Sequence, residues 1–167
     1  MPFQYGSTAG RASAANRETV ISTGDKDLAQ LVDAHVTLVN TMDNTKLDRA
    51  GVQAKFGVTP EQIADYLALI GDPIDNIPGI EGVGPKTAAK WLQQYADVAD
   101  LKANAAQIMG KIGDRLRAAL DKLDLSKELA TIHCDVPIRF ELPKRYWHVD
   151  EYATAIDALL DDLEFRA

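Results

Sequence analysis

The strongest constraint on the fold is a segment rich in glycine and proline, residues 71–85, which separates two helix-forming stretches. Its sequence, GDPIDNIPGIEGVGP, contains four glycines and three prolines. Proline lacks the backbone N–H that a helix needs, and glycine favours turns, so neither neighbouring helix can continue through it. The segment also carries Asp72 and Asp75, and Lys86 and Lys90 follow it. We therefore predict an irregular loop with acids near its start and lysines just beyond its end.

Helix signals dominate the sequence around and after this loop. Thr59 as N-cap and Pro60 at the first helical position predict a helix that Gly71 ends. A second helix is expected from about residue 85, and apolar residues at three- and four-residue spacing predict further helix as far as about residue 130. The stretch 135–142 is expected to be extended, and a last helix is expected to be capped by Asp150.

Strand signals are confined to the N-terminal quarter. Residues 19–23 (TVIST) form a β-branched run that Gly24 closes, and residues 35–40 (HVTLVN) form a second such run after a short helical stretch. A strand, helix, strand order favours two parallel strands at the edge of an α/β sheet. Residues 1–18 show no sustained period, so we expect a poorly ordered arm or a short frayed helix there.

Four aspartates stand where such a fold could gather them. Asp25 and Asp27 directly follow the first strand, at the edge of a parallel sheet where ligands usually bind. Asp72 and Asp75 lie three residues apart in the loop. Oxygen ligands without a nearby pair of His or Cys suit Mg²⁺ or Mn²⁺, and the EF-hand spacing for calcium is absent. The alternative is ordinary turn and capping chemistry, but the two pairs together favour metal ligands.

The other acids are expected to be solvated. This prediction covers the acidic side of the last helix and three isolated residues: Asp157, Asp161, Asp162, Glu164, Asp43, Asp48 and Asp65.

The end of the loop has the features of a phosphate-binding turn. Glycine permits a close approach of backbone N–H groups to a phosphate, and the N-terminus of the following helix adds positive charge. The residues expected to contact a nucleic-acid backbone are Gly79, Gly82, Val83, Gly84, Lys86, Thr87 and Lys90. The Walker and Rossmann spacings are both absent. The alternative is a helical-hairpin turn whose glycines serve packing alone.

Composition limits the class of protein. The chain has 167 residues, 46% of them hydrophobic, which suits one compact domain. It has no apolar run long enough to span a membrane. It has a single cysteine, so it cannot form an internal disulfide, and a cytoplasmic location is expected. The net charge of −7 argues against binding nucleic acid, unless part of the acidity serves a cation.

Three segments resemble a known family. VISTGDKDLAQLV, ADYLALIGDPIDNIPGIEGVGPKTAAKWL and KELATIHCDVPI are similar to the 5′-nuclease domain of bacterial DNA polymerase I, which belongs to the 5′-exonuclease and flap-endonuclease family. The resemblance implies that Asp25, Asp27, Asp72 and Asp75 hold divalent metal. It also implies in-line hydrolysis of a DNA 5′ strand between two metal ions.

The same resemblance assigns the glycine turn to a helix-three-turn-helix. In the family this hairpin holds duplex DNA by its backbone and often binds K⁺. The expected fold is therefore α/β and mostly helical, with a truncated parallel sheet edge packed against this DNA-binding subdomain. The expected divisions are 19–58 for the α/β part, 59–133 for the helix-three-turn-helix region and 134–167 for an extended segment and a helix.

The chain departs from the family pattern before its first strand. The family has further aspartates, an acidic helix and a basic helical arch there, whereas residues 1–18 contain no aspartate and only Glu18. We therefore expect weak or no hydrolysis by this chain alone, unless a partner chain supplies the missing acids. A DNA-binding module without catalysis and a vestigial scaffold stay open as alternatives, and so does the oligomeric state.

Overall fold

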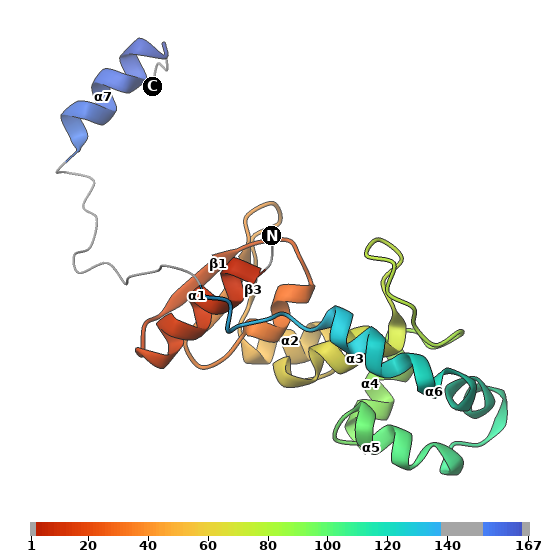
Figure 1. The fold of residues 1–167 in the computed structure, drawn as a ribbon. Helices are drawn as coiled ribbons and strands as arrows, with labels where there is room; N and C mark the ends of the chain where they lie inside the picture. The colour runs from red at the N-terminus through yellow and green to blue at the C-terminus, as the bar shows by residue number, and fades with distance from the viewer. Residues whose placement is uncertain (1–2, 138–151, 165–167) are drawn as a thin grey trace.

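The computed structural model describes residues 3–137 and 152–164 (Figure 1). Its elements, in chain order, are α1 (Phe3–Ala14), β1 (Thr19–Ser22), η1 (Asp27–Leu31), β2 (Val36–Asn40), β3 (Thr45–Leu47), α2 (Arg49–Phe56), η2 (Pro60–Gln62), α3 (Ile63–Ile70), α4 (Pro85–Gln94), α5 (Val98–Ala103), η3 (Ala105–Gln107), α6 (Gly110–Ala130) and α7 (Ala153–Asp162).

A small sheet with the order β1-β2-β3 lies at one end of the main body. β1 and β2 are parallel, with Thr19 opposite Val36, as the strand, helix, strand order predicts. β3 was not expected and pairs antiparallel to β2, through a short turn in which Asn44 has a φ of 57°. The predicted class, mostly helical with a truncated sheet, is confirmed, although the sheet is mixed rather than purely parallel.

The N-terminal segment, for which we expected a poorly ordered arm or a short frayed helix, is helical. It forms the 12-residue helix α1, in which Ser7, Ala9 and Ala12 are buried. Gly6 lies so close to the chain after α6 that an added Cβ would meet Ile132 and Cys134. Because the buried side chains that the structure describes in α1 are small, hydrophobic periodicity gives little signal for this helix.

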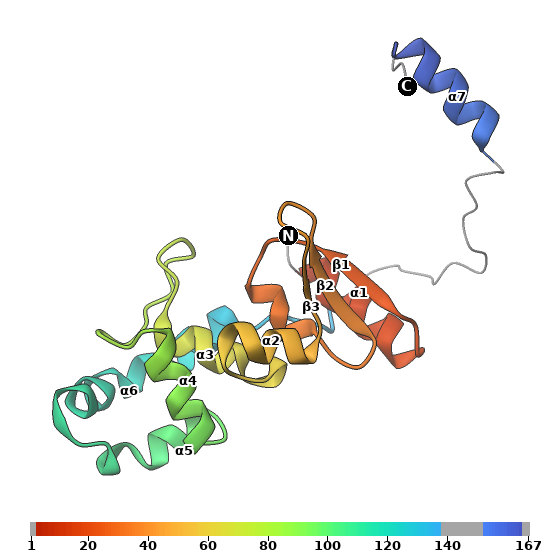
Figure 2. The same cartoon turned by 180° about the vertical axis from the view of Figure 1, so that it is seen from behind.

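Helices α3 and α6 form the centre of the core and pack against each other. Ile63 and Leu67 of α3 are almost fully buried, as are Leu116 and Leu123 of α6. From this pair the sheet and α1 extend in one direction and α4 and α5 in the other, while residues 71–84 project from one side (Figures 1 and 2). Among the described residues, no helix is long and apolar enough to cross a membrane.

Two of the acids expected to be solvated are structural. Asp65 is buried at 4% exposure; it pairs with Lys127 of α6 at 2.7 Å and accepts the Val98 N–H. Asp48 caps α2 by accepting the Gly51 N–H. Asp65 can lie on the inward face of α3 because Lys127 neutralises its charge. Lys127 lies 62 residues further along the chain, so no local sequence pattern could reveal this pairing.

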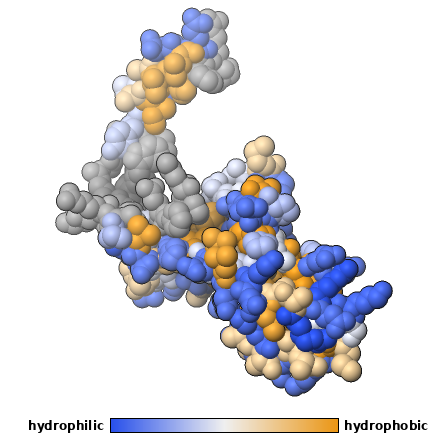
Figure 3. All heavy atoms as spheres, turned by 45° about the vertical axis from the view of Figure 1, so that its right-hand side comes forward, coloured by the Kyte–Doolittle hydropathy of each residue, from blue (hydrophilic) through white to orange (hydrophobic). Residues whose placement is uncertain are grey.

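The last helix, α7, lies apart from the main body (Figures 1 and 2). Its acids are exposed as expected, and apolar side chains gather on one side of it (Figure 3), with Leu159, Leu160 and Leu163 exposed. The cap predicted at Asp150 and most of the stretch predicted to be extended lie outside the described residues.

Substitution of Asp65 by Ala should lower the free energy of unfolding by about 2 kcal/mol, because it leaves the Val98 N–H and the Lys127 ammonium without their acceptor. Chemical denaturation measures this loss. The matched control is Asp124→Ala, which breaks the exposed Lys102–Asp124 pair and should cost under about 1 kcal/mol. Equal losses in the two variants would contradict the structural role of Asp65.

Candidate metal centre and glycine hairpin

The first two aspartates are held by a tight turn after β1. Thr23 Oγ1 accepts the N–H of Asp25, and Asp25 Oδ1 accepts the N–H of Asp27, each at 3.0 Å. Asp27 is the first residue of η1. The turn therefore fixes the direction in which the chain leaves the strand and places both carboxylates beyond the carboxyl end of β1.

The second pair lies in a closed loop after α3. Asp72 and Ile77 exchange backbone hydrogen bonds of 2.9 and 2.8 Å, and the Ile80 N–H returns to the Leu69 carbonyl. Gly71 ends α3 at a φ of 71° and crosses Gly79 so closely that a Cβ on either would overlap backbone atoms. Glycine is required at this crossing, so the loop has one defined shape.

Helix α6 and the residues directly after it are hydrogen-bonded to both acidic segments. Ser126 Oγ donates to the Pro78 carbonyl at 2.6 Å, at the far end of the loop. Gln30 of η1 donates to the Ala130 carbonyl and accepts the Ile132 N–H, at 3.0 and 2.9 Å. The two acidic segments are thereby tied to one rigid helix and its C-terminal extension.

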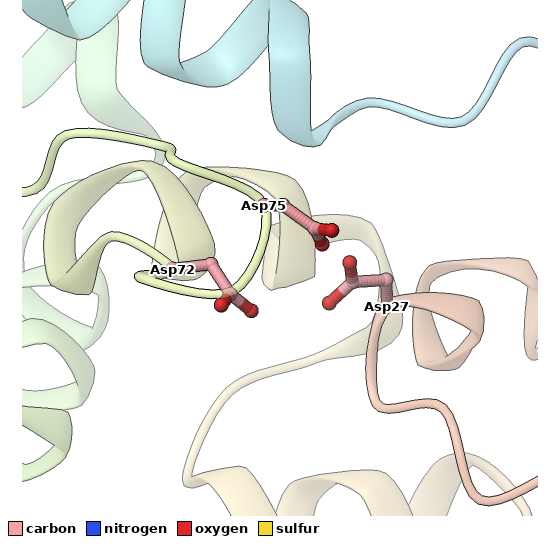
Figure 4. A group of neighbouring side chains, drawn as sticks. All are labelled: Asp27, Asp72 and Asp75. Carbon is pink, nitrogen blue, oxygen red and sulfur yellow. The ribbon is translucent and has the colours of Figure 1, made fainter.

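Three of the four predicted acids converge (Figure 4). Asp27, Asp72 and Asp75 each bring one carboxylate oxygen to within 4.8 Å of the others. Asp25 is not in this closest group, but it lines a cavity of about 300 Å³ together with Asp27 and Asp75. The predicted gathering of carboxylates is found; their role as ligands remains a prediction.

The pKa values of Asp27 and Asp72 are shifted in opposite directions. Burial, followed by the neighbouring charge of Asp25, raises the pKa of Asp27 from 3.8 to about 6. The Lys26 ammonium, which contacts Asp72 Oδ2, lowers the pKa of Asp72, and the Ile74 N–H adds to this effect. At neutral pH Asp27 and Asp72 are therefore both mostly ionised, and their negative charge favours a nearby cation.

The donor set fits a hard divalent cation. All its candidate ligands are carboxylate oxygens, the type that Mg²⁺ and Mn²⁺ prefer. Asp27 Oδ1 is also buried and has no hydrogen-bond partner among the described residues. A buried carboxylate oxygen of this kind is costly unless a proton or a cation satisfies it.

The glycine hairpin is only partly as the sequence suggests. Gly84 has open space at its Cβ position, which leaves room for a close backbone approach, whereas a Cβ on Gly82, which has a φ of 77°, would meet the Arg115 guanidinium. Gly79 instead packs against the backbone of Ile70 and Gly71. For Gly79 the structure therefore provides a packing reason, which was the alternative that the sequence left open.

The remaining hairpin residues divide by exposure. Lys86 and Lys90 are exposed on α4. Val83 is buried at 6% exposure, and the N–H groups of Val83 and Thr87 are already bonded to the carbonyls of Ile80 and Gly84. The two lysines and Gly84 are thus the parts of the hairpin that are accessible to a phosphate, and the Arg115 guanidinium lies beside Gly82.

Sequence reasoning missed the residues that organise the site. Lys26, Gln30 and Ser126 make the contacts described above, yet none belongs to a recognisable ligand pattern. Lys26 did carry a signal, because it stands between Asp25 and Asp27 in the sequence. Gln30 and Ser126 act across about 100 and 48 residues of sequence, so only the fold identifies them.

Comparison with known proteins shows the class to which this fold and site belong. The family model for the 5′-3′ exonuclease, C-terminal SAM fold, matches residues 58–153, more than half of the chain. The chain belongs to this family, which confirms the resemblance seen in the sequence.

Curated relatives extend this result over nearly the whole chain. DNA polymerase I of Pseudomonas aeruginosa is 45% identical over 169 residues, covering 96% of this chain and 18% of that protein. DNA polymerase I of Mycobacterium tuberculosis is 41% identical, covering 88% and 17%, and that of Bacillus caldotenax is 36% identical, covering 97% and 19%. The chain thus spans less than a fifth of the length of these relatives.

Solved structures share the fold at low sequence identity. A bacteriophage T5 protein co-crystallised with metal ions matches with a TM-score of 0.72 at 19% identity, covering 77% of this chain and 49% of that one. A T5 flap endonuclease in complex with DNA and metal ions matches with a TM-score of 0.71 at 19% identity, covering 77% and 48%. About half of the T5 fold therefore corresponds to this chain.

The raised pKa of Asp27 predicts a pH dependence of stability in the absence of metal. Between about pH 4 and 7 the folded state binds a proton that the unfolded state has released, so the free energy of unfolding should fall as pH rises. Asp27→Asn should remove this fall and make the metal-free protein more stable than the wild type at pH 7. Denaturation in EDTA across this range measures it.

The control is Asp121→Asn, which changes an exposed acid of α6 and should leave the wild-type profile unchanged. The lowered pKa of Asp72 acts in another window, since its contribution is lost only below about pH 4. A wild-type stability that rises from pH 4 to pH 7, or an Asp27→Asn profile parallel to it, would contradict the assignment.

Proposed function

We propose that this chain is the metal-binding and duplex-binding portion of a structure-specific 5′-3′ exonuclease or flap endonuclease that hydrolyses DNA. The observation that carries the proposal is the convergence of Asp27, Asp72 and Asp75 at the start of the loop that ends in the glycine hairpin. Membership of the 5′-3′ exonuclease family supports the same reaction class.

Asp27, Asp72 and Asp75 would hold Mg²⁺ or Mn²⁺, and Asp25 lines a cavity together with Asp27 and Asp75. A divalent ion in such a site lowers the pKa of bound water and neutralises charge on a phosphate, and a second ion completes the arrangement expected for the family. The chain's own residues supply orientation. The glycine crossing and the contacts of Ser126 and Gln30 hold the carboxylates in position before substrate arrives.

The hairpin would hold the backbone of duplex DNA without reading its sequence. The open space at Gly84 and the exposed Lys86 and Lys90 are suited to phosphate oxygens. Carbonyl groups of the same turn are the expected site of a K⁺ ion. The overall charge of −7 does not oppose this contact, because part of the acidity lies in the cation site.

Hydrolysis by this chain alone should be weak or absent, and a partner polypeptide would complete the site. β1 is an edge strand, and Val20 on it is 66% exposed. Leu129, at 55% exposure, lies in the wall of the acidic cavity. Leu129 thus adjoins the carboxylates, and a segment bringing further acids would dock there and along the free edge of β1.

A second candidate function is a DNA-binding module without catalysis. It is favoured by the exposed Lys86 and Lys90 beside Gly84, which can contact a DNA backbone whether or not the carboxylates hold a metal ion. A vestigial scaffold is the remaining alternative and predicts no DNA binding at all.

Incubation with a labelled 5′-flap DNA and Mn²⁺ tests the proposal. We expect slow release of 5′ products, and a loss of at least about tenfold in rate for Asp72→Asn, because the variant removes a ligand charge from the site. Asp121→Asn serves as the control and should cleave at the wild-type rate. A gel shift on the same DNA accompanies the assay.

The outcomes separate the candidates. A gel shift without cleavage at any protein concentration would reject hydrolysis by the isolated chain and favour the binding module. Equal cleavage by wild type and Asp72→Asn would indicate a contaminating nuclease and contradict the proposed site. No shift even at low salt would leave only the scaffold.

A further inference from the structure

Lys26 is the positive charge inside the acidic site. It lies between Asp25 and Asp27 in the sequence, at the N-cap of η1, and its ammonium contacts Asp72 Oδ2 across 46 residues of sequence. The Asp72 side chain is only 5% exposed, whereas that of Lys26 is 40% exposed. The contact thus joins a buried carboxylate to a cation that still reaches solvent.

Each oxygen of Asp72 has its own partner. Oδ1 accepts the Ile74 N–H at 2.8 Å, which orients the carboxylate within the loop. Oδ2 is held by Lys26. A buried carboxylate beside other carboxylates is stable only when paired, so Lys26 provides the charge that the cluster requires when no divalent ion is present.

A divalent ion and the ammonium are in competition at this position. An ion held by Asp27, Asp72 and Asp75 would lie among oxygens that are within 4.8 Å of one another, and the ammonium already contacts one of these carboxylates. Positive charges at so short a separation repel strongly. The lysine stem is flexible and its head is partly in water, so Lys26 can leave Asp72 without unfolding η1.

We infer that Lys26 is a tethered counter-ion: it holds Asp72 in the ligand position when the metal is absent and releases it when a divalent cation binds. The inference rests on the proposed metal site and adds a positioning residue to it. Two consequences follow. Lys26 keeps the metal-free carboxylates gathered, and it weakens the affinity for metal, because the ion must displace an existing charge.

Calorimetric titration of the DNA-free protein with Mn²⁺, together with thermal melts in EDTA, tests this inference. Lys26→Met keeps the aliphatic stem and removes the charge. We expect its dissociation constant for Mn²⁺ to be roughly five- to thirtyfold lower than that of the wild type. Its melting temperature in EDTA should be lower than that of the wild type, and the rise on adding Mn²⁺ should be larger.

Two variants control for charge and for folding. Lys55→Met removes an exposed lysine that lines a neighbouring pocket with Lys26, so it changes the net charge equally and should alter the affinity by less than about twofold. Lys26→Arg keeps the charge and should bind Mn²⁺ with an affinity close to that of the wild type, which also shows that position 26 tolerates substitution.

An Mn²⁺ affinity of Lys26→Met that is unchanged, weaker or no tighter than that of Lys55→Met would overturn the inference while the metal site stood. A wild-type protein that binds no Mn²⁺ would remove the proposed function and the inference together.

Discussion

Carboxylates from two separate segments lie within 4.8 Å of one another, and the rest of the site depends on what holds them there against repulsion. Each such pair of like charges costs on the order of 1–3 kcal/mol near a protein surface. The opposing framework is mainly backbone: the crossing of Gly71 and Gly79 fixes the loop, and α6 ties down both segments through Ser126 and Gln30. Because these contacts offset the repulsion before any ion arrives, the metal-free protein has a preformed site with an excess of negative charge.

Electrostatics then divides the acids into two kinds. Asp72, paired with Lys26, has a lowered pKa and stays ionised. Burial and the neighbouring charges raise the pKa of Asp27 to about 6. The buried Oδ1 of Asp27 lacks a hydrogen-bond partner within the described chain. A bound divalent cation would satisfy the orphaned oxygen of Asp27 and would replace the single ammonium charge at Asp72 by two. The chemistry of the site and the role inferred for Lys26 thus have one physical cause.

The sequence predicts the parts of this arrangement that are local. The β-branched run before Asp25, the glycine and proline breaks around Asp72 and the helix signal at Thr59 each act over a few residues. The strand, helix, strand order even gives the parallel pairing of β1 and β2. Strand β3 and buried Asp65 escaped prediction because a turn at Asn44 and a distant lysine decide them. For residues 1–18 the sequence left a helix and a poorly ordered arm both open, because the buried residues of α1 are small. Similarly, the sequence predicts that Gly79 contacts phosphate, whereas the structure shows a packing reason for this glycine at its crossing with Gly71.

The central claim is that Asp27, Asp72 and Asp75 share one divalent cation. Anomalous diffraction from crystals soaked in Mn²⁺ tests it most directly, because the metal position is then seen independently of any activity. The account predicts an anomalous peak about 2.1 Å from carboxylate oxygens of all three residues. A peak found only at other acids, such as Asp161 and Asp162 of α7, or no peak at saturating Mn²⁺, would contradict it.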